Sequence, residues 1–183
     1  MTPRILLFEE PERFTVGTVG LPGERTFFIQ VKDQLRMISV SLEKAQVQAL
    51  AERLLYMLKE IRQSDPTIVV ERLQRDDLPL DSPIEEEFRV GIIGLAFDAS
   101  RTLIQIDLQA VSENESTNPE FIDVDDLSND KDILRVLITP SEAERFSKRS
   151  LTVVSAGRAP CPFCGGPIDP GGHLCPRANG YRR

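Results

Sequence analysis

Phe-Thr-Val-Gly-Thr-Val-Gly, residues 14–20, returns in the second half of the chain as Phe-Arg-Val-Gly-Ile-Ile-Gly, residues 88–94. Short runs rich in Val, Ile, Phe and Thr are typical of β-strands. Two further apolar runs follow each copy, at residues 25–31 and 35–40 in the first half and at 101–106 and 134–139 in the second. Each third run leads into a helical pattern. The sequence therefore predicts a half-unit of strand, strand, strand and helix.

The two predicted helices carry different start signals. Residues 42–63 place apolar side chains three and four positions apart, as in an amphipathic helix, and Ser41 precedes them as a candidate N-cap. At the second helix, Thr139 stands at the cap, a proline follows at the first helical position, and Glu142 lies three residues beyond the cap. This combination predicts a capping box, and the helix is expected to run to about Ser150 or slightly beyond.

These patterns predict an α+β fold of two strand-strand-strand-helix units, at about residues 1–63 and 84–156, with antiparallel sheets. The shared pattern favours an internal duplication, whereas chance similarity is the alternative, because all amphipathic meanders share a period of two. Residues 1–156 would form this domain, and residues 157–183 a zinc knuckle with a basic tail. The proline-containing residues 64–83 connect the two units.

Two further features of the first 156 residues invite a structural explanation. Glycines stand inside predicted strands at Gly17, Gly20, Gly91 and Gly94, where they weaken a strand unless something needs the missing side chain. A bulge or a tight crossing is the favoured explanation, and a close approach to an anionic ligand is the other. Residues 68–70, Ile-Val-Val, are expected to add a short strand or a helical turn.

The C-terminal cysteines have the spacing of a metal site. Cys161 and Cys164 form a Cys-x-x-Cys pair followed by Gly-Gly-Pro, and His173, the only histidine of the chain, lies two positions before Cys175. Three thiolates and one imidazole complete a tetrahedron without an open position, which is typical of structural rather than catalytic zinc. The sequence thus predicts one structural Zn²⁺ bound by these four residues, since soft ligands favour this ion.

Two other interpretations of the cysteines remain open. Three buried free thiols would need no metal, but they cluster in a segment with almost no aliphatic residues, which can scarcely fold without a cross-link. Cys-Pro-Phe-Cys is also similar to the redox dithiol of glutaredoxins, in which Cys161 and Cys164 would exchange disulfides. That dithiol opens a helix, whereas here Gly-Gly-Pro follows it, so the redox hypothesis is the weaker one.

The chain resembles a bacterial, mainly actinobacterial, family. The residues that carry the resemblance are the Phe-x-Val-Gly-x-x-Gly start, the Cys-Pro-Phe-Cys knuckle and the ending Cys-Pro-Arg-Ala-Asn-Gly-Tyr-Arg-Arg at residues 175–183. The family is the domain of unknown function numbered 3090, and the likeness covers essentially the whole length. The resemblance implies no particular reaction, and it transfers no catalytic residue to this chain.

The composition favours an interaction or regulatory module over an enzyme. Arg177, Tyr181, Arg182 and Arg183 would offer a basic surface to another protein or a phosphorylated ligand, although the tail could equally dock onto its own domain. A nucleic acid is the alternative partner, disfavoured by the net charge of -7. An enzyme acting on a phosphorylated ligand is a further alternative. The sequence contains neither the Gly-x-Ser-x-Gly motif of a nucleophile elbow nor a Walker phosphate-binding loop. Its single histidine is assigned to the metal.

The chain start and the hydropathy predict a cytoplasmic location without a membrane partner. Residues 1–9 lack the basic-then-apolar layout of a signal peptide, and no run approaches the roughly 20 apolar residues of a membrane span. The three cysteines are too few and too close together for a secreted disulfide framework. The sequence makes no prediction about oligomeric state.

Overall fold

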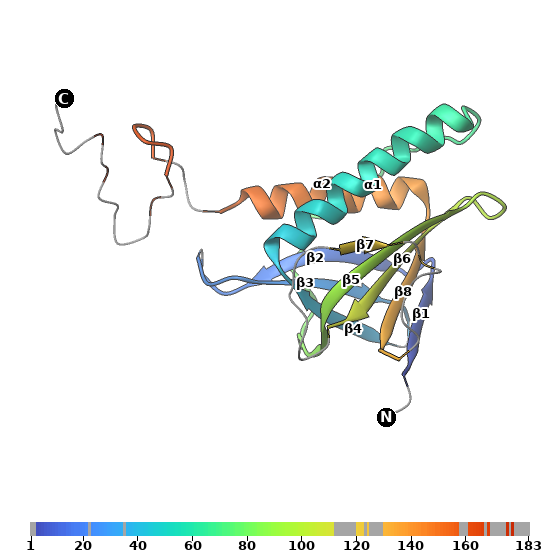
Figure 1. The fold of residues 1–183 in the computed structure, drawn as a ribbon, viewed down its shortest axis with the longest axis horizontal. Helices are drawn as coiled ribbons and strands as arrows, with labels where there is room; N and C mark the ends of the chain where they lie inside the picture. The colour runs from blue at the N-terminus through green and yellow to red at the C-terminus, as the bar shows by residue number, and fades with distance from the viewer. Residues whose placement is uncertain are drawn as a thin grey trace.

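The computed structural model describes residues 3–21, 23–34, 36–111, 120–122, 124, 130–157, 161–166, 168, 175 and 177. Within them an eight-stranded mixed sheet is covered on one side by two helices (Figure 1). The strands are β1 (Ile5–Glu9), β2 (Arg13–Val19), β3 (Thr26–Lys32), β4 (Met37–Leu42), β5 (Glu86–Asp98), β6 (Leu103–Ala110), β7 (Glu120–Ile122) and β8 (Ile133–Ile138). The helices are α1 (Lys44–Ser64) and α2 (Pro140–Ser155). The α+β class is confirmed.

The sheet is mixed, so the prediction of antiparallel sheets is wrong for three of the strand pairs. The strand order is β1-β8-β6-β5-β4-β3-β2, with β7 pairing β5. Pairing is antiparallel within β2-β3-β4 and within β5-β6-β8, but β4-β5, β1-β8 and β5-β7 are parallel. At β4-β5 the reason is the crossover made by α1 and residues 65–85, which returns the chain to the end at which β4 began. The periodicity of apolar residues carries no information about the direction in which the next strand enters the sheet.

The sheet curls strongly, because its two outermost strands are neighbours in sequence. β1 and β2 lie at opposite ends of the strand order, yet only residues 10–12 join them. Seven strands laid flat would span about 29 Å, whereas four peptide units reach at most about 15 Å. The strand β1 itself was not predicted from the sequence. Its placement beside β8 gives the sheet the shape of an incomplete barrel.

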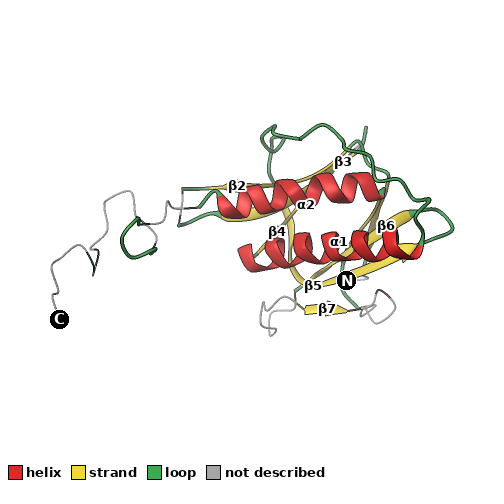
Figure 2. Cartoon of the chain, turned by 90° about the horizontal axis from the view of Figure 1, so that it is seen from above, coloured by secondary structure: helices red, strands yellow, loops and turns green. Residues whose placement is uncertain are grey.

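Helix α2 lies along the free edge of β2 and closes part of the gap. The Phe14 and Phe146 rings stack with their centroids 4.3 Å apart and an angle of 22° between ring planes. Arg149 Nε donates to the carbonyl oxygen of Val16 at 2.7 Å, and so satisfies an acceptor on this edge. The helix α1 lies beside α2 over the same face, as Figure 2 shows from above. Both helices are thereby packed on a single hydrophobic core.

The helix starts confirm one prediction and correct another. Thr139 caps α2 and forms the predicted capping box with Glu142. At α1 the N-cap is Glu43, which forms a capping box with Gln46, whereas Ser41 belongs to β4 and pairs with Phe28. The strand simply runs two residues further than its apolar pattern indicates. The predicted apolar stripe of α1 is buried, at Val47, Leu50, Leu54, Leu58 and Ile61.

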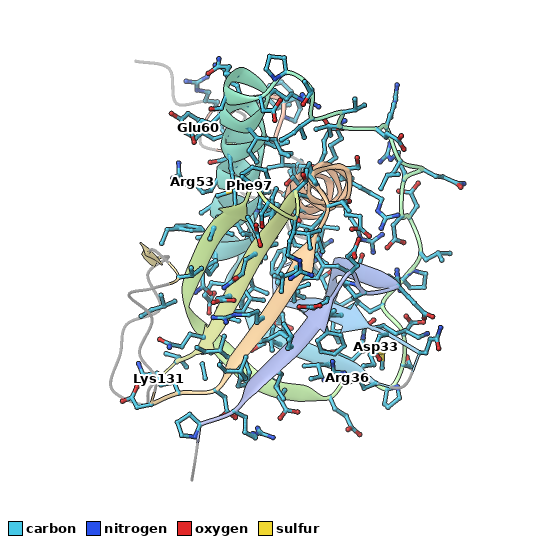
Figure 3. All side chains as sticks on the ribbon, turned by 90° about the vertical axis from the view of Figure 1, so that its right-hand side faces the viewer. Asp33, Arg36, Arg53, Glu60, Phe97 and Lys131 are labelled. Atoms are coloured by element: carbon cyan, nitrogen blue, oxygen red, sulfur yellow. The ribbon has the colours of Figure 1, made fainter. Side chains whose placement is uncertain are left out.

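The connector, residues 65–85, joins α1 to β5 without regular secondary structure, so neither the short strand nor the helical turn expected at residues 68–70 is formed. It passes α2 and then runs down the molecule beside β2 (Figure 3). Gln30 holds it by two hydrogen bonds, donating to the Asp81 carbonyl oxygen at 3.0 Å and accepting from the Asp81 N–H at 2.8 Å. Ordered irregular structure of this length needs such contacts with the scaffold, because it has no hydrogen-bond ladder of its own.

Close packing accounts for two of the strand glycines. A Cβ atom on Gly17 would lie 2.6 Å from Cγ of Leu80 in the connector, and one on Gly91 would lie 3.0 Å from Cα of Val111. Gly91 also stands where the β5-β6 register shifts, which marks a bulge. A tight crossing at Gly17 and a bulge at Gly91 therefore explain these two glycines, as the sequence favoured, without an anionic ligand. That the two halves of the chain arose by duplication stays a prediction.

Candidate metal centre

The first two cysteines lie on a closed turn. The Cys161 N–H donates to the Gly166 carbonyl oxygen at 2.7 Å, and the Gly165 N–H donates to the Cys161 carbonyl oxygen at 2.8 Å. Gly165 has a φ of +74°, a conformation that glycine adopts without a steric cost. The glycine that follows the Cys-x-x-Cys pair thus lets the backbone reverse and brings both sulfur atoms to the same side.

The third cysteine joins them to form a cluster of three thiols. The Sγ atoms of Cys161, Cys164 and Cys175 all lie within 4.8 Å of one another, and none of the three forms a disulfide. Cys161 and Cys175 are buried, and Cys164 is half-buried. Sulfur ligands about 2.3 Å from a tetrahedral zinc ion would lie about 3.8 Å apart, which this cluster accommodates. The arrangement is compatible with a metal site.

Backbone donors favour the ionised form of one thiol. The N–H groups of Cys164 and Phe163 donate to the Cys161 sulfur and lower its pKa to about 6. The Gly166 N–H acts in the same direction on Cys164, but burial and the neighbouring thiols outweigh it and raise the pKa of Cys164. A thiolate is the form of cysteine that binds metals and attacks disulfides. The turn therefore favours the thiolate form of Cys161.

One residue of the predicted partner surface is described. Arg177 Nη1 donates to the Phe163 carbonyl oxygen at 3.2 Å, so this part of the tail folds back onto the cysteine turn. The Phe163 side chain is 63% exposed beside it. The predicted ligand His173 and the predicted contact residues Tyr181, Arg182 and Arg183 lie outside the described residues. The structure thus brings together three of the four predicted metal ligands.

A family model with the description "Protein of unknown function (DUF3090)" matches residues 6–175, from β1 to the third cysteine. The chain belongs to this family. No curated protein and no solved structure is significantly similar to the DUF3090 chain. Of its described helices, neither is long and apolar enough to span a lipid bilayer. The cytoplasmic location stays a prediction.

The DUF3090 fold also contains a half-buried charge network that the sequence did not indicate. Arg13 on β2 donates to the Asp76 carboxylate at 2.9 and 3.0 Å and to Asp81 at 3.0 Å. Burial alone would raise the pKa of Asp76. The hydrogen bonds from Arg13, with the charges of Arg13 and Arg149, outweigh burial and hold that pKa below its usual value. The network ties the connector to β2 and α2. The residues are too far apart in sequence for any local pattern to reveal it.

A cavity of about 550 Å³ opens between the connector and α2. Its walls come from residues 72–77 of the connector and from residues 144–153 of the helix. Cavities of roughly 300–1,000 Å³ are typical of small-molecule sites. The Asp98 carboxylate lies outside this cavity and accepts hydrogen bonds from the Ser100 N–H and hydroxyl. These bonds lower the pKa of Asp98 and hold the turn between β5 and β6.

Proposed function

We propose that the DUF3090 chain is a non-catalytic interaction or regulatory module whose C-terminal segment is held by one structural Zn²⁺. The observation that supports this most directly is the convergence of three cysteine sulfur atoms within 4.8 Å of one another. His173, two positions from Cys175, would be the fourth ligand. Zinc suits the set because thiolates and imidazole are soft and borderline ligands, and because a closed tetrahedron leaves no position for substrate.

The bound metal would supply the cross-link that this segment needs in order to fold. Within residues 161–166 the described hydrogen bonds close one short turn. Binding energy of a structural zinc ion is folding energy, because the unfolded chain has no preformed site. The thiolate character of Cys161 supports metal binding at neutral pH, since a thiol must lose its proton before it can ligate.

An exposed aromatic ring and an arginine supply the contact surface of this module. Phe163 is 63% exposed at the cysteine turn, and Arg177 is hydrogen-bonded to its carbonyl oxygen. Aromatic residues and arginine are enriched at the centres of protein interfaces, where they contribute most of the binding free energy. The partner that this chemistry favours is another protein, which Tyr181, Arg182 and Arg183 would contact as well. A phosphorylated ligand of the tail is the alternative.

The metal is tested by native mass spectrometry and elemental analysis of the full chain. We expect one zinc ion per chain in the wild type and loss of the ion in Cys161→Ser and in Cys175→Ser. Phe163→Ala is the matched control, because it changes the turn without removing a ligand, and it should keep its zinc. A wild-type protein that contains no metal after purification without chelators would refute the metal site.

The partner class is tested with the same variants. A protein partner should bind the wild type, and its binding should be lost both in Phe163→Ala and in Cys161→Ser. Salt-sensitive binding of random oligonucleotides that Arg177→Ala abolishes would instead show a nucleic-acid partner. Thiol–disulfide exchange with a model disulfide, lost in Cys161→Ser, would show that the lowered pKa of Cys161 serves redox chemistry.

A further inference from the structure

The cavity between the connector and α2 carries more positive than negative charge. Five cationic side chains line it, Arg72, Arg75, Arg145, Lys148 and Arg149, against three acidic ones, Asp76, Asp77 and Glu144. The chain as a whole has a formal net charge of -7. A local excess of positive charge in an acidic protein attracts anions to this place, because opposite charges at short range outweigh the screened field of the distant surface.

The acidic side chains of the cavity already have cationic partners. Asp76 pairs with Arg13 at 2.9 Å and with Arg149 at 3.6 Å. Lys148 pairs with Glu144 at 2.9 Å, and Arg62 approaches the same carboxylate at 3.3 Å.

Asp77 lies 3.6 Å from Arg75, with both side chains largely exposed. The positive charge of the cavity therefore comes from groups outside these pairs.

Two arginines of the cavity have no such partner. Within the part of the chain that the structure describes, Arg72 and Arg145 make neither an ion pair nor a side-chain hydrogen bond. Arg72 comes from the connector and Arg145 from α2, so each of the two walls of the cavity contributes one of these arginines. Each offers a planar fork of N–H donors that matches the oxygen atoms of a phosphate or carboxylate group.

The walls of the cavity are held in place before any ligand binds. Arg149 donates to the Leu78 carbonyl oxygen at 2.7 Å and to the Asp76 carbonyl oxygen, and so fixes the connector against the helix. The Glu71 N–H donates to the Ser141 hydroxyl at 2.8 Å, one residue before the cavity wall on the connector and three residues before it on α2. Because both walls are fixed, little of the binding free energy of a ligand would be spent on ordering the backbone of the site.

We propose that this cavity binds a small molecule that carries a phosphate monoester. Its two negative charges match the two unpaired guanidinium groups of Arg72 and Arg145. Leu73, Leu151 and Val153 line the same cavity and provide apolar surface for the organic part of the ligand. The site is separate from the cysteine cluster and lies on the folded domain, so it does not depend on the proposed zinc ion.

The test is isothermal titration calorimetry on the full chain at low ionic strength, with phenyl phosphate as the probe. We expect saturable binding of one molecule per chain, tighter than the binding of inorganic phosphate, which lacks the apolar group. Benzoate, with one charge, should bind more weakly than phenyl phosphate. Arg72→Gln with Arg145→Gln should weaken phenyl phosphate binding at least about tenfold, since two charge-assisted contacts are lost.

Two control variants make the outcome specific. Arg53→Gln with Lys59→Gln removes the same charge from the exposed face of α1, and it should change the affinity by less than about twofold if the effect is local. Arg177→Gln with Arg182→Gln and Arg183→Gln should bind the probe as the wild type does. Absence of saturable binding, unchanged affinity in the cavity variant, or loss of binding in the tail variant instead would overturn the proposal. Equal affinity for benzoate would overturn the assignment to phosphate.

Discussion

Gln46 is the residue that joins the start of α1 to the sheet. Its side chain is completely buried, with all of its principal hydrogen-bonding groups in use. Oε1 accepts from the Glu43 N–H at 2.8 Å, and Nε2 donates to the carbonyl oxygens of Val90 at 3.1 Å and Gly91 at 3.0 Å. Those carbonyls lie where the β5-β6 register shifts, and a bulge leaves carbonyl groups without a partner in the ladder. A neutral amide carries both an acceptor and a donor, so it can bind the Glu43 N–H and the two carbonyl oxygens at once.

We predict that Gln46→Glu destabilises the protein by about 3 kcal/mol at neutral pH, because a buried carboxylate would face two carbonyl oxygens and lose both donated hydrogen bonds. Urea unfolding followed by circular dichroism measures the free energy of unfolding. The control is Gln48→Glu on the exposed face of the same helix, for which we expect a change within about 0.5 kcal/mol. Equal losses in the two variants would contradict the role assigned to Gln46.

At the scale of elements, the connector is as much a part of the sheet packing as the helices are. It contributes Leu80, which lies over Gly17 on β2, and Asp81, which is bound by Gln30 on β3. Arg13 from β2 and Arg149 from α2 both donate to the carbonyl oxygen of Leu78 in the connector. The connector therefore covers strands that would otherwise present polar side chains and backbone to solvent.

We predict that Gly17→Ala costs about 1–3 kcal/mol, because the new Cβ would lie 2.6 Å from Leu80 Cγ and force the connector outward. In a Leu80→Ala background the same change should be neutral or slightly stabilising, since alanine costs less entropy than glycine in a strand. Unfolding free energies of the wild type, both single variants and the double variant form the cycle. Additive effects would show that Leu80 is not what requires the glycine.

At the scale of the whole molecule, we propose two parts with different sources of stability. The sheet and helices share one core of buried apolar side chains. Burial of each large side chain contributes about 1.5–3 kcal/mol, so this part needs no cross-link. The cysteine cluster lies beyond α2, where the described residues 161–166 are drawn apart from the sheet (Figure 1). Its stability would come from metal coordination instead.

Metal removal should therefore affect only one of these parts. With a strong zinc chelator present, we expect the urea midpoint of the core to change little and proteolysis to become rapid beyond residue 157. Mass spectrometry of the fragments locates the cleavage, and circular dichroism follows the core. Acidification should release the metal as well, since thiolates must be protonated as it leaves. Simultaneous unfolding of core and tail would contradict this division.

Local patterns in the sequence were sufficient for most of the elements and for part of the candidate site. Periodicity located α1, α2 and six of the strands, and the Thr139–Glu142 capping box was found from its residue types alone. The Cys-x-x-Cys pair and Cys175 were identified by spacing, because a metal site is formed by few residues close in sequence. All of these features depend on residues that lie close together in the sequence.

The tertiary structure alone decided how those elements combine. The parallel pairs β4-β5 and β1-β8, the curl that brings β1 near β2, and the crowding of Gly17 by Leu80 all join residues far apart in the chain. The cavity with Arg72 and Arg145 exists for the same reason, since a connector and a helix 70 residues apart must meet to form it. Hydrophobic periodicity records which face of a strand or helix is buried, but it does not record which distant element covers that face.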